Sequence, residues 1–264
     1  MSLSTTKYTS KLHSARVLIL GGTSGIGFCV AEASLEHGAH VCISGSKPSK
    51  LSGAISRLQS SYPKLASHVS GYVCDLSQLP SLEANLDALL KIAVGDGKID
   101  HVVFTAGDAL KIVPVAEAAV ESIQQTGTVR FMGSLMLAKL APTYMSPGPR
   151  SSITLTGGSN SHRPIKGWSV IAAWGSGLEG MARGLAVDLA PLRVNLISPG
   201  AVYTELFGDI PKERLEGVLQ RFKDGSLVGQ VGTPENVAEA YLYAMKDQNL
   251  TGTIIQSDGG RLLK

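Results

Sequence analysis

A glycine-rich stretch near the start of the chain, residues 21–27 (GGTSGIG), directly follows an apolar run and directly precedes a segment of helical period. A strand that ends in such a turn brings the unpaired N–H groups and the positive dipole end of the next helix onto an anion such as a pyrophosphate. Glycine is required because a Cβ atom would hold the anion away from the backbone. A tight turn without a ligand is the alternative for an isolated stretch. The pattern predicts a turn that binds a dinucleotide through Gly21, Thr23, Ser24 and Ile26.

A second candidate site lies at residues 44–50 (SGSKPSK), which hold hydroxyl groups and two ammonium groups but no carboxylate. In dinucleotide sites a carboxylate at the end of the second strand accepts the ribose 2′-hydroxyl of NAD, and it would repel a 2′-phosphate. The alternative is that the two lysines are solvated loop charges. The missing carboxylate nevertheless favours NADP(H) over NAD, with contacts predicted from Ser44, Ser46, Lys47 and Lys50.

Short β-branched or apolar runs alternate along the chain with longer segments of helical period. The runs are residues 17–20, 41–44, 72–74, 101–104, 152–156, 194–198 and 253–256, and the helical segments are 26–37, 79–94, 124–145, 168–189 and 234–245. This alternation is typical of repeated βαβ units. We therefore expect an α/β protein with a single doubly wound Rossmann fold, in which helices cover both faces of a seven-stranded, mainly parallel sheet.

The length of 264 residues suits one large domain. The first ~15 residues are polar and are expected to be frayed or superficial. We predict a polar extension over residues 1–11 and one Rossmann-fold domain over residues 12–264.

Composition excludes several classes of partner. The 24 basic and 21 acidic residues give a net charge of +3 and are scattered, so no nucleic-acid footprint is expected. Cys29, Cys42 and Cys74 lie in apolar runs without a C-x-x-C pair or a histidine cluster, which predicts buried thiols and no metal site. No apolar run approaches the ~18 residues of a membrane span, and the N-terminus lacks the apolar core of a signal peptide. We expect no membrane partner and a cytoplasmic location.

Further motifs follow the glycine-rich stretch in a fixed order: Asp75-Leu76, Thr105-Ala106-Gly107, Arg193-Val194-Asn195, Ser198-Pro199-Gly200 and Ser257-Asp258-Gly259-Gly260. Together with the spacing G-x-x-x-G-x-G, this order resembles the short-chain dehydrogenase/reductase (SDR) family over nearly the whole chain. The resemblance implies that Asp75 and Leu76 contact the adenine of a nicotinamide dinucleotide. It further implies a cofactor cleft lined by Thr105, Ala106 and Gly107, and a nicotinamide carboxamide held by Pro199, Gly200, Val202 and Thr204.

The proton-transfer pair of that family, Tyr-x-x-x-Lys, is missing here. In the family, delivery of a hydride to a carbonyl makes an alkoxide, which a phenol must protonate, and the lysine lowers the pKa of that phenol. Alignment of the long helix places Ile171 at the tyrosine, Gly175 at the lysine and roughly Gly158 at the catalytic serine. A fourth family residue, an asparagine, aligns with Arg130. All four positions have changed.

Two explanations for this loss remain open. One is a pseudoenzyme that keeps the fold for binding. The other is different chemistry, because an acceptor that is already cationic, such as an iminium, needs no proton during reduction. Arg130 would then orient a substrate carbonyl or stabilise a developing anion, or it would simply form a salt bridge. Asp108 would pair with Arg130 or with a substrate cation, or it would cap the following segment.

The segment 159–168 replaces the substrate loop of the family. Ser159 is one residue from the serine position, and His162 or Lys166 could supply a proton to a carbonyl substrate, although a surface loop is the alternative for His162. Trp168 and Trp174 offer flat apolar area to an aromatic or polycyclic ligand, with helix packing as the alternative, especially for Trp174.

The stretches GGTSGIGF, HVVFTAGDAL, SITLTGG and GWSVIAAWGSG are similar to a fungal SDR subgroup without the usual catalytic residues. That subgroup resembles the reductase/Diels–Alderases of bicyclic diazaoctane indole-alkaloid biosynthesis, which reduce an iminium-type dipeptide intermediate with NADPH and then shape a cycloaddition. An aspartate just before the tryptophan is important in those enzymes, whereas this chain has Ile165 and Lys166 there, which puts cyclase activity in doubt.

The resemblance implies an NADP(H)-dependent reductase of an iminium or carbonyl intermediate in secondary metabolism. The alternatives are a redox-silent or bifunctional cyclase or isomerase, and a binding-only pseudoenzyme. The resemblance also implies a homodimer or homotetramer through residues 124–145 and 168–189.

Overall fold

The computed structural model describes residues 6–95, 97–107 and 112–264. Its centre is one sheet of seven strands in the order β3-β2-β1-β4-β5-β6-β7, in which every neighbouring pair is parallel. The strands are β1 (Arg16–Leu20), β2 (His40–Gly45), β3 (Val69–Val73), β4 (His101–Phe104), β5 (Ser152–Thr156), β6 (Arg193–Pro199) and β7 (Ile254–Ser257). The predicted α/β, doubly wound Rossmann fold is confirmed, and its strand order reverses between β1 and β4, where such sheets bind their ligands.

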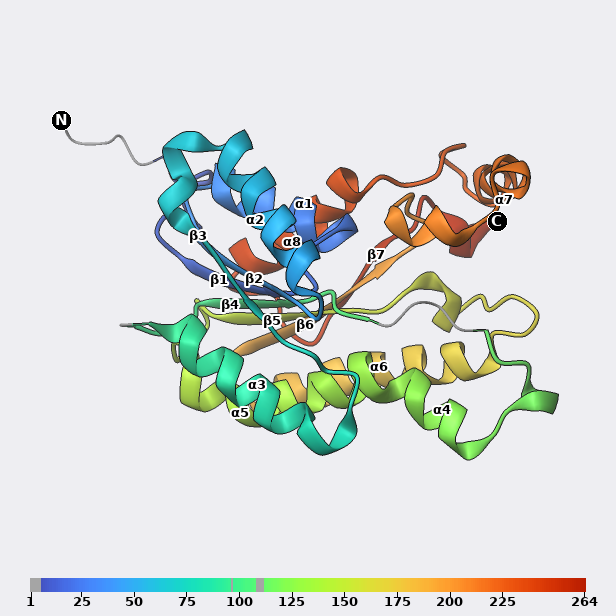
Figure 1. Cartoon of the computed structure of the whole chain (residues 1–264), viewed down its shortest axis with the longest axis horizontal. Helices are drawn as coiled ribbons and strands as arrows, with labels where there is room; N and C mark the ends of the chain where they lie inside the picture. Colours follow the sequence, from blue (N-terminus) through green and yellow to red (C-terminus); the bar gives the residue numbers. More distant parts are fainter. Residues whose placement is uncertain (1–5, 96, 108–111) are drawn as a thin grey trace.

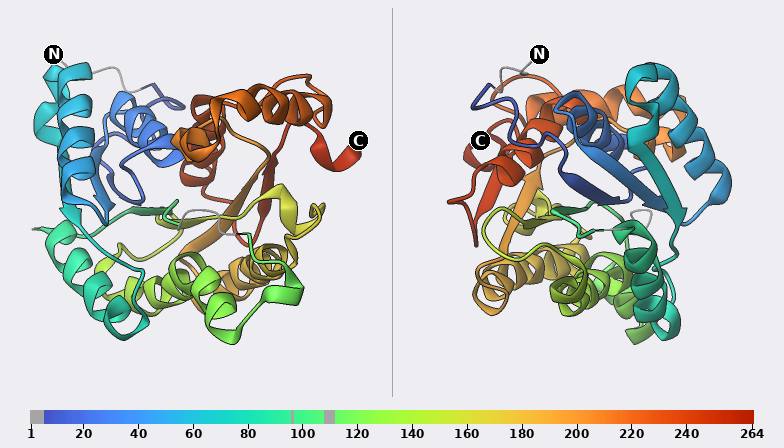
Figure 2. Two further views of the ribbon diagram at one scale, coloured as in Figure 1. Left: turned by 45° about the vertical axis from the view of Figure 1, so that its right-hand side comes forward. Right: turned by 90° about the vertical axis from the view of Figure 1, so that its left-hand side faces the viewer.

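Helices cover both faces of this sheet (Figure 1). One layer contains α1 (Gly25–Glu36), α2 (Pro48–Ser61) and α8 (Pro234–Lys246); the other contains α3 (Leu79–Val94), α4 (Val120–Gly127), α5 (Gly133–Tyr144) and α6 (Ser169–Asp188). Figure 2 shows the twisted sheet between the two layers, with α7 (Lys212–Asp224) beyond the strand ends. Among the described residues, no helix combines the length and the apolar character that a membrane crossing requires.

Alternation along the central strands separates two apolar cores. In β1, Leu18 and Leu20 point into the core beneath α3, α5 and α6, whereas Val17 and Ile19 point into the core beneath α1, α2 and α8. Successive side chains of a strand leave opposite faces of the sheet, so a strand covered on both sides reads as a continuous apolar run. The three cysteines are buried free thiols, as predicted.

Arg193 explains part of the Arg193-Val194-Asn195 motif. Its guanidinium donates to the carbonyl oxygens of Pro149, Ala244, Met245 and Leu250 at distances of 2.6 to 3.1 Å. The side chain is 2% exposed, so these bonds satisfy a buried cation. The arginine of this motif therefore ties the end of α8 to the start of β6.

Several sequence predictions need correction. Residues 124–145 do not form one helix, because a π-helical turn, η3 (Thr128–Met132), separates α4 from α5. The segment that starts at Lys47 is not simply a loop, since α2 begins at Pro48, a residue that suits the first turn of a helix. Helix α7 was not predicted. The expectation of a superficial N-terminus fails at Leu12, which is fully buried.

Candidate cofactor and substrate site

The glycine-rich turn between β1 and α1 lies directly against the end of β4. Gly21 has φ of +86°, and a Cβ atom there would stand 2.5 Å from the backbone nitrogen of Ala106. A Cβ atom at Gly27 would collide with the carbonyl oxygen of Gly21 and with the hydroxyl of Thr105. The Thr105 hydroxyl donates to the carbonyl of Leu20 at 2.9 Å. This close backbone approach at the start of α1 fits the pyrophosphate of a dinucleotide.

The N-terminus of α1 binds a carboxylate from a segment that is distant in the sequence. Ser24, the residue before the helix, makes no capping bond with its side chain, and the first turn of α1 contains no acidic residue. Instead, the N–H of Gly25 donates to the carboxylate of Glu205 at 2.9 Å. The start of α1 therefore accepts an anionic group in this structure.

The predicted 2′-phosphate contacts lie at the end of β2 and the start of α2. Ser44 is 2% exposed, and its carbonyl oxygen accepts from the N–H groups of Gly21 and Gly22. Ser46, Lys47 and Lys50 are exposed, with the two lysines flanking the first turn of α2. Hydroxyl and ammonium groups thus stand beside a helix N-terminus, an arrangement that suits an anion.

The other predicted cofactor contacts occupy the carboxyl ends of the neighbouring strands. Asp75 is exposed, and its carboxylate accepts from the N–H of Ser77 at 2.9 Å. Leu76 is 4% exposed, so its side chain packs into the core. A large cavity is lined by several of them, namely Ile26, Gly107, Pro199, Gly200, Val202 and Thr204.

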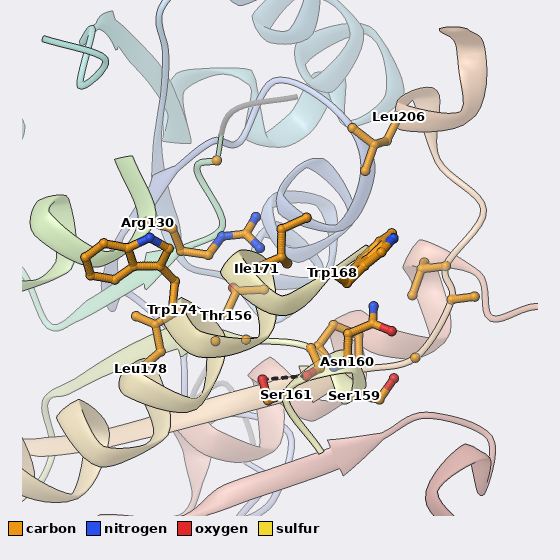
Figure 3. Close-up of a pocket in the computed structure, with 18 of the residues that line it drawn as sticks. Arg130, Thr156, Ser159, Asn160, Ser161, Trp168, Ile171, Trp174, Leu178 and Leu206 are labelled. Carbon is orange, nitrogen blue, oxygen red and sulfur yellow. Dashed lines mark hydrogen bonds between the residues drawn. The ribbon is translucent and has the colours of Figure 1, made fainter. Parts of the chain in front are cut away.

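This cavity has a volume of about 820 Å³ and extends from the glycine-rich turn past the ends of β4, β5 and β6. Its apolar wall consists of Phe131, Ile165, Trp168, Ile171, Trp174, Leu178, Leu206, Phe207 and Phe222. Its charged members among the described residues are Arg130 and Arg261, and no described carboxylate lines it. Figure 3 shows apolar side chains gathered around the guanidinium of Arg130. The cavity suits a large apolar ligand that carries hydrogen-bond acceptors.

Arg130 lies in the π-helical turn η3, and its guanidinium extends toward Ile171 (Figure 3). Its Nε donates to the carbonyl of Ala106 at 3.4 Å, and a side chain at Gly107 would collide with it. Single π-helical turns inside helices occur often at functional sites. The turn places Arg130 over the end of β4, next to the predicted nicotinamide side of the cavity.

The short helix η4 (Ser159–Ser161) packs against α6 at Gly175, the position of the family lysine. The Ser161 hydroxyl donates to the carbonyl of Gly158 at 2.9 Å, and the Ser176 hydroxyl donates to the carbonyl of Ser161 at 3.3 Å. Ser159 lines the cavity although it is only 1% exposed. The segment that contains the predicted serine is therefore ordered against α6.

His162 and Lys166, the other two candidate proton donors of this segment, do not line the cavity. The His162 Nε2 atom lies 2.8 Å from the carboxylate of Glu179, a buried residue of α6, and Lys166 is exposed. Asp108 lies outside the described residues. Of the five predicted catalytic residues, the structure therefore brings together Arg130 and Ser159.

Both tryptophans line the cavity, but their surroundings differ. The Trp174 Nε1 donates to the carbonyl of Ile123 at 2.9 Å, and the ring centroid lies 4.8 Å from that of Phe131. A Cβ atom at Gly127 would stand 2.5 Å from the Trp174 ring. Trp174 thus packs α6 against α4 while it presents an edge to the cavity. Trp168, just before α6, lies across the cavity from Trp174 in Figure 3.

Sequence reasoning overlooked Thr156, which ends β5 and lines the cavity. Its hydroxyl donates to the carbonyl of Phe104 at 2.7 Å and lies 2.6 Å from the hydroxyl of Tyr241. Burial raises the pKa of the Tyr241 phenol well above its ordinary value. Tyr241 therefore stays protonated, and its hydroxyl is committed to Thr156. The pairing joins β5 to α8, 85 residues apart in the sequence, so no local sequence signal reveals it.

The chain is similar over nearly its whole length to proteins of one family. A model described as the SDR-like Rossmann domain matches residues 8–264. The short-chain dehydrogenase/reductase malC of Malbranchea aurantiaca is 49% identical over 255 residues, which cover 96% of each chain. The solved MalC reductase/Diels-Alderase from the same organism has a TM-score of 0.93 at 48% identity, with 98% of this chain and 100% of that chain covered. A small-chain dehydrogenase solved in complex with NADPH has a TM-score of 0.74 at 28% identity, with 95% and 100% covered.

Proposed function

Because this chain belongs to the short-chain dehydrogenase/reductase family, we propose that it is an NADP(H)-dependent reductase of an apolar iminium or carbonyl intermediate in secondary metabolism. The resemblance to the fungal reductase/Diels–Alderase subgroup is confirmed. The observation that carries the proposal is the apolar cavity, which reaches the predicted nicotinamide contacts. Ile171 and Gly175 line it at the positions where the family has its tyrosine and lysine.

The residues of the glycine-rich turn would hold the cofactor pyrophosphate, and Lys47 and Lys50 would contact the 2′-phosphate. When bound, NADPH would supply a hydride to the substrate. The apolar wall would exclude water from the reacting bond and hold a polycyclic substrate flat against Trp168 and Ile171.

Arg130 is the residue best placed to act on the substrate. Ile171 has no proton to give, and the Thr156 hydroxyl already donates to Phe104. A guanidinium stays charged and offers several donors, so Arg130 would stabilise negative charge on a carbonyl oxygen. The guanidinium groups of Arg130 and Arg261 line the cavity and offer N–H donors. This charge pattern favours a substrate that presents carbonyl oxygens, whether the reduced bond is a C=O or a neighbouring C=N.

A second candidate, a bifunctional reductase and cyclase, is favoured by the name of the solved relative, a reductase/Diels-Alderase. The large apolar cavity would suit a folded substrate. At the position of the aspartate expected in those enzymes, however, Ile165 lines the cavity and Lys166 lies outside it. A redox-silent cyclase and a binding-only protein remain the further alternatives.

Cofactor consumption separates these candidates. The experiment incubates the protein with NADPH deuterated at the nicotinamide C4 and with a panel of cyclic iminium salts and ketones that carry aromatic rings. A reductase gives NADPH oxidation and a product that contains deuterium. Conversion of a substrate to an isomer without oxidation of NADPH would show that the protein is a cyclase or isomerase and not a reductase. Cofactor binding without any conversion across the panel would favour the binding-only protein.

We also propose a cytoplasmic homodimer or homotetramer that forms through α5 and α6. On α6, Val187 is 76% exposed, and Cβ atoms at Gly180 and Gly184 would meet nothing within 4 Å. An open face of small and apolar residues suits close helix packing between two copies. Light scattering that shows only monomer at micromolar concentration would contradict this assembly.

A further inference from the structure

Glu205 joins two segments that are 180 residues apart in the sequence. It begins the short helix η5 (Glu205–Asp209), which follows β6, and its carboxylate accepts the N–H of Gly25 at 2.9 Å. The neighbouring Thr204 packs on the same glycine, because its Cγ2 atom lies 3.1 Å from the position of a Cβ atom at Gly25. The segment after β6 thus rests on the start of α1.

The bond from Glu205 supplies what α1 lacks locally. The side chain of Ser24 does not cap the helix, and no acidic residue stands in its first turn. An anion near a helix N-terminus is stabilised by the free N–H groups and by the helix dipole. Glu205 therefore acts as the anionic cap of α1.

The pyrophosphate of a dinucleotide would use the same end of the same helix. Two anionic groups that compete for one set of N–H donors repel each other, so both cannot be held there at full strength. We propose that Glu205 is an internal competitor of the cofactor pyrophosphate, which must release the N–H of Gly25 when NADPH binds. This inference rests on the proposed use of NADP(H).

Release of Glu205 would have a consequence for the substrate cavity. Thr204, Leu206 and Phe207 line the cavity on both sides of Glu205 in the sequence. Thr204 accepts the N–H of Leu206 at 3.3 Å, so η5 has its own cap and does not depend on the bond to Gly25. Because η5 can keep its shape as it leaves α1, cofactor binding would move one wall of the cavity.

The test is Glu205→Gln, which removes the charge and keeps the size of the side chain. The matched control is Glu213→Gln, which removes the same charge from the exposed first turn of α7. Calorimetry at low ionic strength measures the Kd of NADPH and of 2′-AMP, a fragment with the 2′-phosphate but no pyrophosphate. We expect Glu205→Gln to bind NADPH roughly threefold to tenfold more tightly, the scale of one anion at a helix terminus. The affinity for 2′-AMP should not change, and the control should match the wild type for both ligands.

A second variant, Glu205→Ala, removes the acceptor oxygen as well as the charge and should also bind NADPH more tightly. Unchanged or weaker NADPH binding in both variants, with normal binding of 2′-AMP, would overturn the role of Glu205 and leave the proposed cofactor intact. An equal gain in NADPH affinity in the Glu213→Gln control would show that the effect comes from the overall charge of the protein. That result would also overturn the role of Glu205. Failure of the wild type to bind either ligand would overturn the proposed function itself.

Discussion

The hydroxyl oxygen of Ser161 lies 2.5 Å from the point at which a Cβ atom at Gly175 would stand. Real Cβ atoms do not approach an oxygen so closely, so any side chain at position 175 requires the Ser161 hydroxyl to turn away. That hydroxyl donates to the carbonyl of Gly158 and would lose this bond. The family's lysine is missing from the sequence, and Ser161 packs against the position at which its Cβ atom would stand.

We expect that the double variant Ile171→Tyr with Gly175→Lys will not improve the native reaction. The lysine would force the Ser161 hydroxyl out of its bond to the carbonyl of Gly158, and the tyrosine would take volume from the cavity at Ile171. The measurement is the rate of NADPH oxidation with the best iminium and ketone substrates, together with the unfolding temperature. Gly53→Lys on α2 is the control, because a Cβ atom there meets nothing within 4 Å. Faster turnover of the native substrate in the double variant would contradict the account of the missing pair.

Arg130→Ala should lower turnover by about a hundredfold, the scale for loss of one preorganised electrostatic donor. Arg130 lines the cavity, and its Nε contacts the carbonyl of Ala106 at 3.4 Å. The Kd of NADPH, measured separately, shows whether the fold and the cofactor site survive. Arg214→Ala, at an exposed position of α7, is the control for loss of one charge. Undiminished turnover in Arg130→Ala would show that Arg130 takes no part in the reaction.

NADPH should bind at least about tenfold more tightly than NADH, a ratio that needs only ~1.4 kcal/mol. The physical reason is the absence of an acid in residues 44–50 and the presence of Lys47 and Lys50 beside the start of α2. Replacement of both lysines by alanine should weaken NADPH binding and leave NADH binding nearly unchanged. Calorimetric titration with both cofactors measures this, with the exposed Lys64→Ala as the control. Equal affinities in the wild type would refute the choice of NADP(H).

His162→Ala should retain turnover and lose stability. His162 pairs with Glu179 at 2.8 Å and does not line the cavity. Its removal leaves the buried carboxylate of Glu179 without this partner, which is destabilising. Urea unfolding and the NADPH oxidation assay measure the two effects on the same preparation. An inactive but normally folded His162→Ala would show that the proton comes from this histidine.

Acid should destabilise the protein through His101. Burial, with a smaller contribution from Arg193, lowers the pKa of His101 to about 4 from an ordinary value of 6.5. Between these values the unfolded chain binds a proton that the folded chain does not, so the stabilisation is present above pH 6.5 and is lost as the pH falls toward 4. Between pH 7 and pH 5 the loss from this group is about 2 kcal/mol.

The measurement for His101 is urea unfolding at both pH values for the wild type and for His101→Gln. The glutamine does not titrate, so the variant should show a shallower decline between pH 7 and pH 5, whatever its stability at pH 7. Parallel declines in the two proteins would assign the acid sensitivity to other groups.

The central sheet could be predicted from sequence because its strands are buried on both faces. Runs such as residues 101–104 and 152–156 are recognisable without tertiary information, and both match the observed strands. The helices that were not predicted have weaker local signals. Helix α7 is rich in charge and has no buried residue, and of its apolar residues Phe222 lines the cavity.

The sequence predicts those parts of the candidate site that consecutive residues form through their backbone. It does not predict the contacts between side chains that are far apart in the sequence. The glycine-rich turn is encoded in consecutive residues, and it lies against Thr105 and Ala106 at the end of β4. In contrast, the contacts of Glu205 with Gly25 and of Thr156 with Tyr241 each join distant parts of the chain. The sequence predicts one loop over residues 159–168, but residues 159–161, Ile165 and Trp168 line the cavity while His162 pairs with Glu179 of α6.

The π-helical turn between α4 and α5 also bears on the ancestry of the site. Such a turn holds one residue more than an α-helical turn, so a lineage gains or loses it by insertion or deletion rather than by substitution. Deletion of one residue from Thr128–Met132 would rotate α4 by about 100° relative to α5. Ser122, Gln125 and Thr126 would then turn away from the cavity that they now line. Relatives that lack this wall of the cavity would therefore be one residue shorter between α4 and α5, and no single substitution would distinguish them.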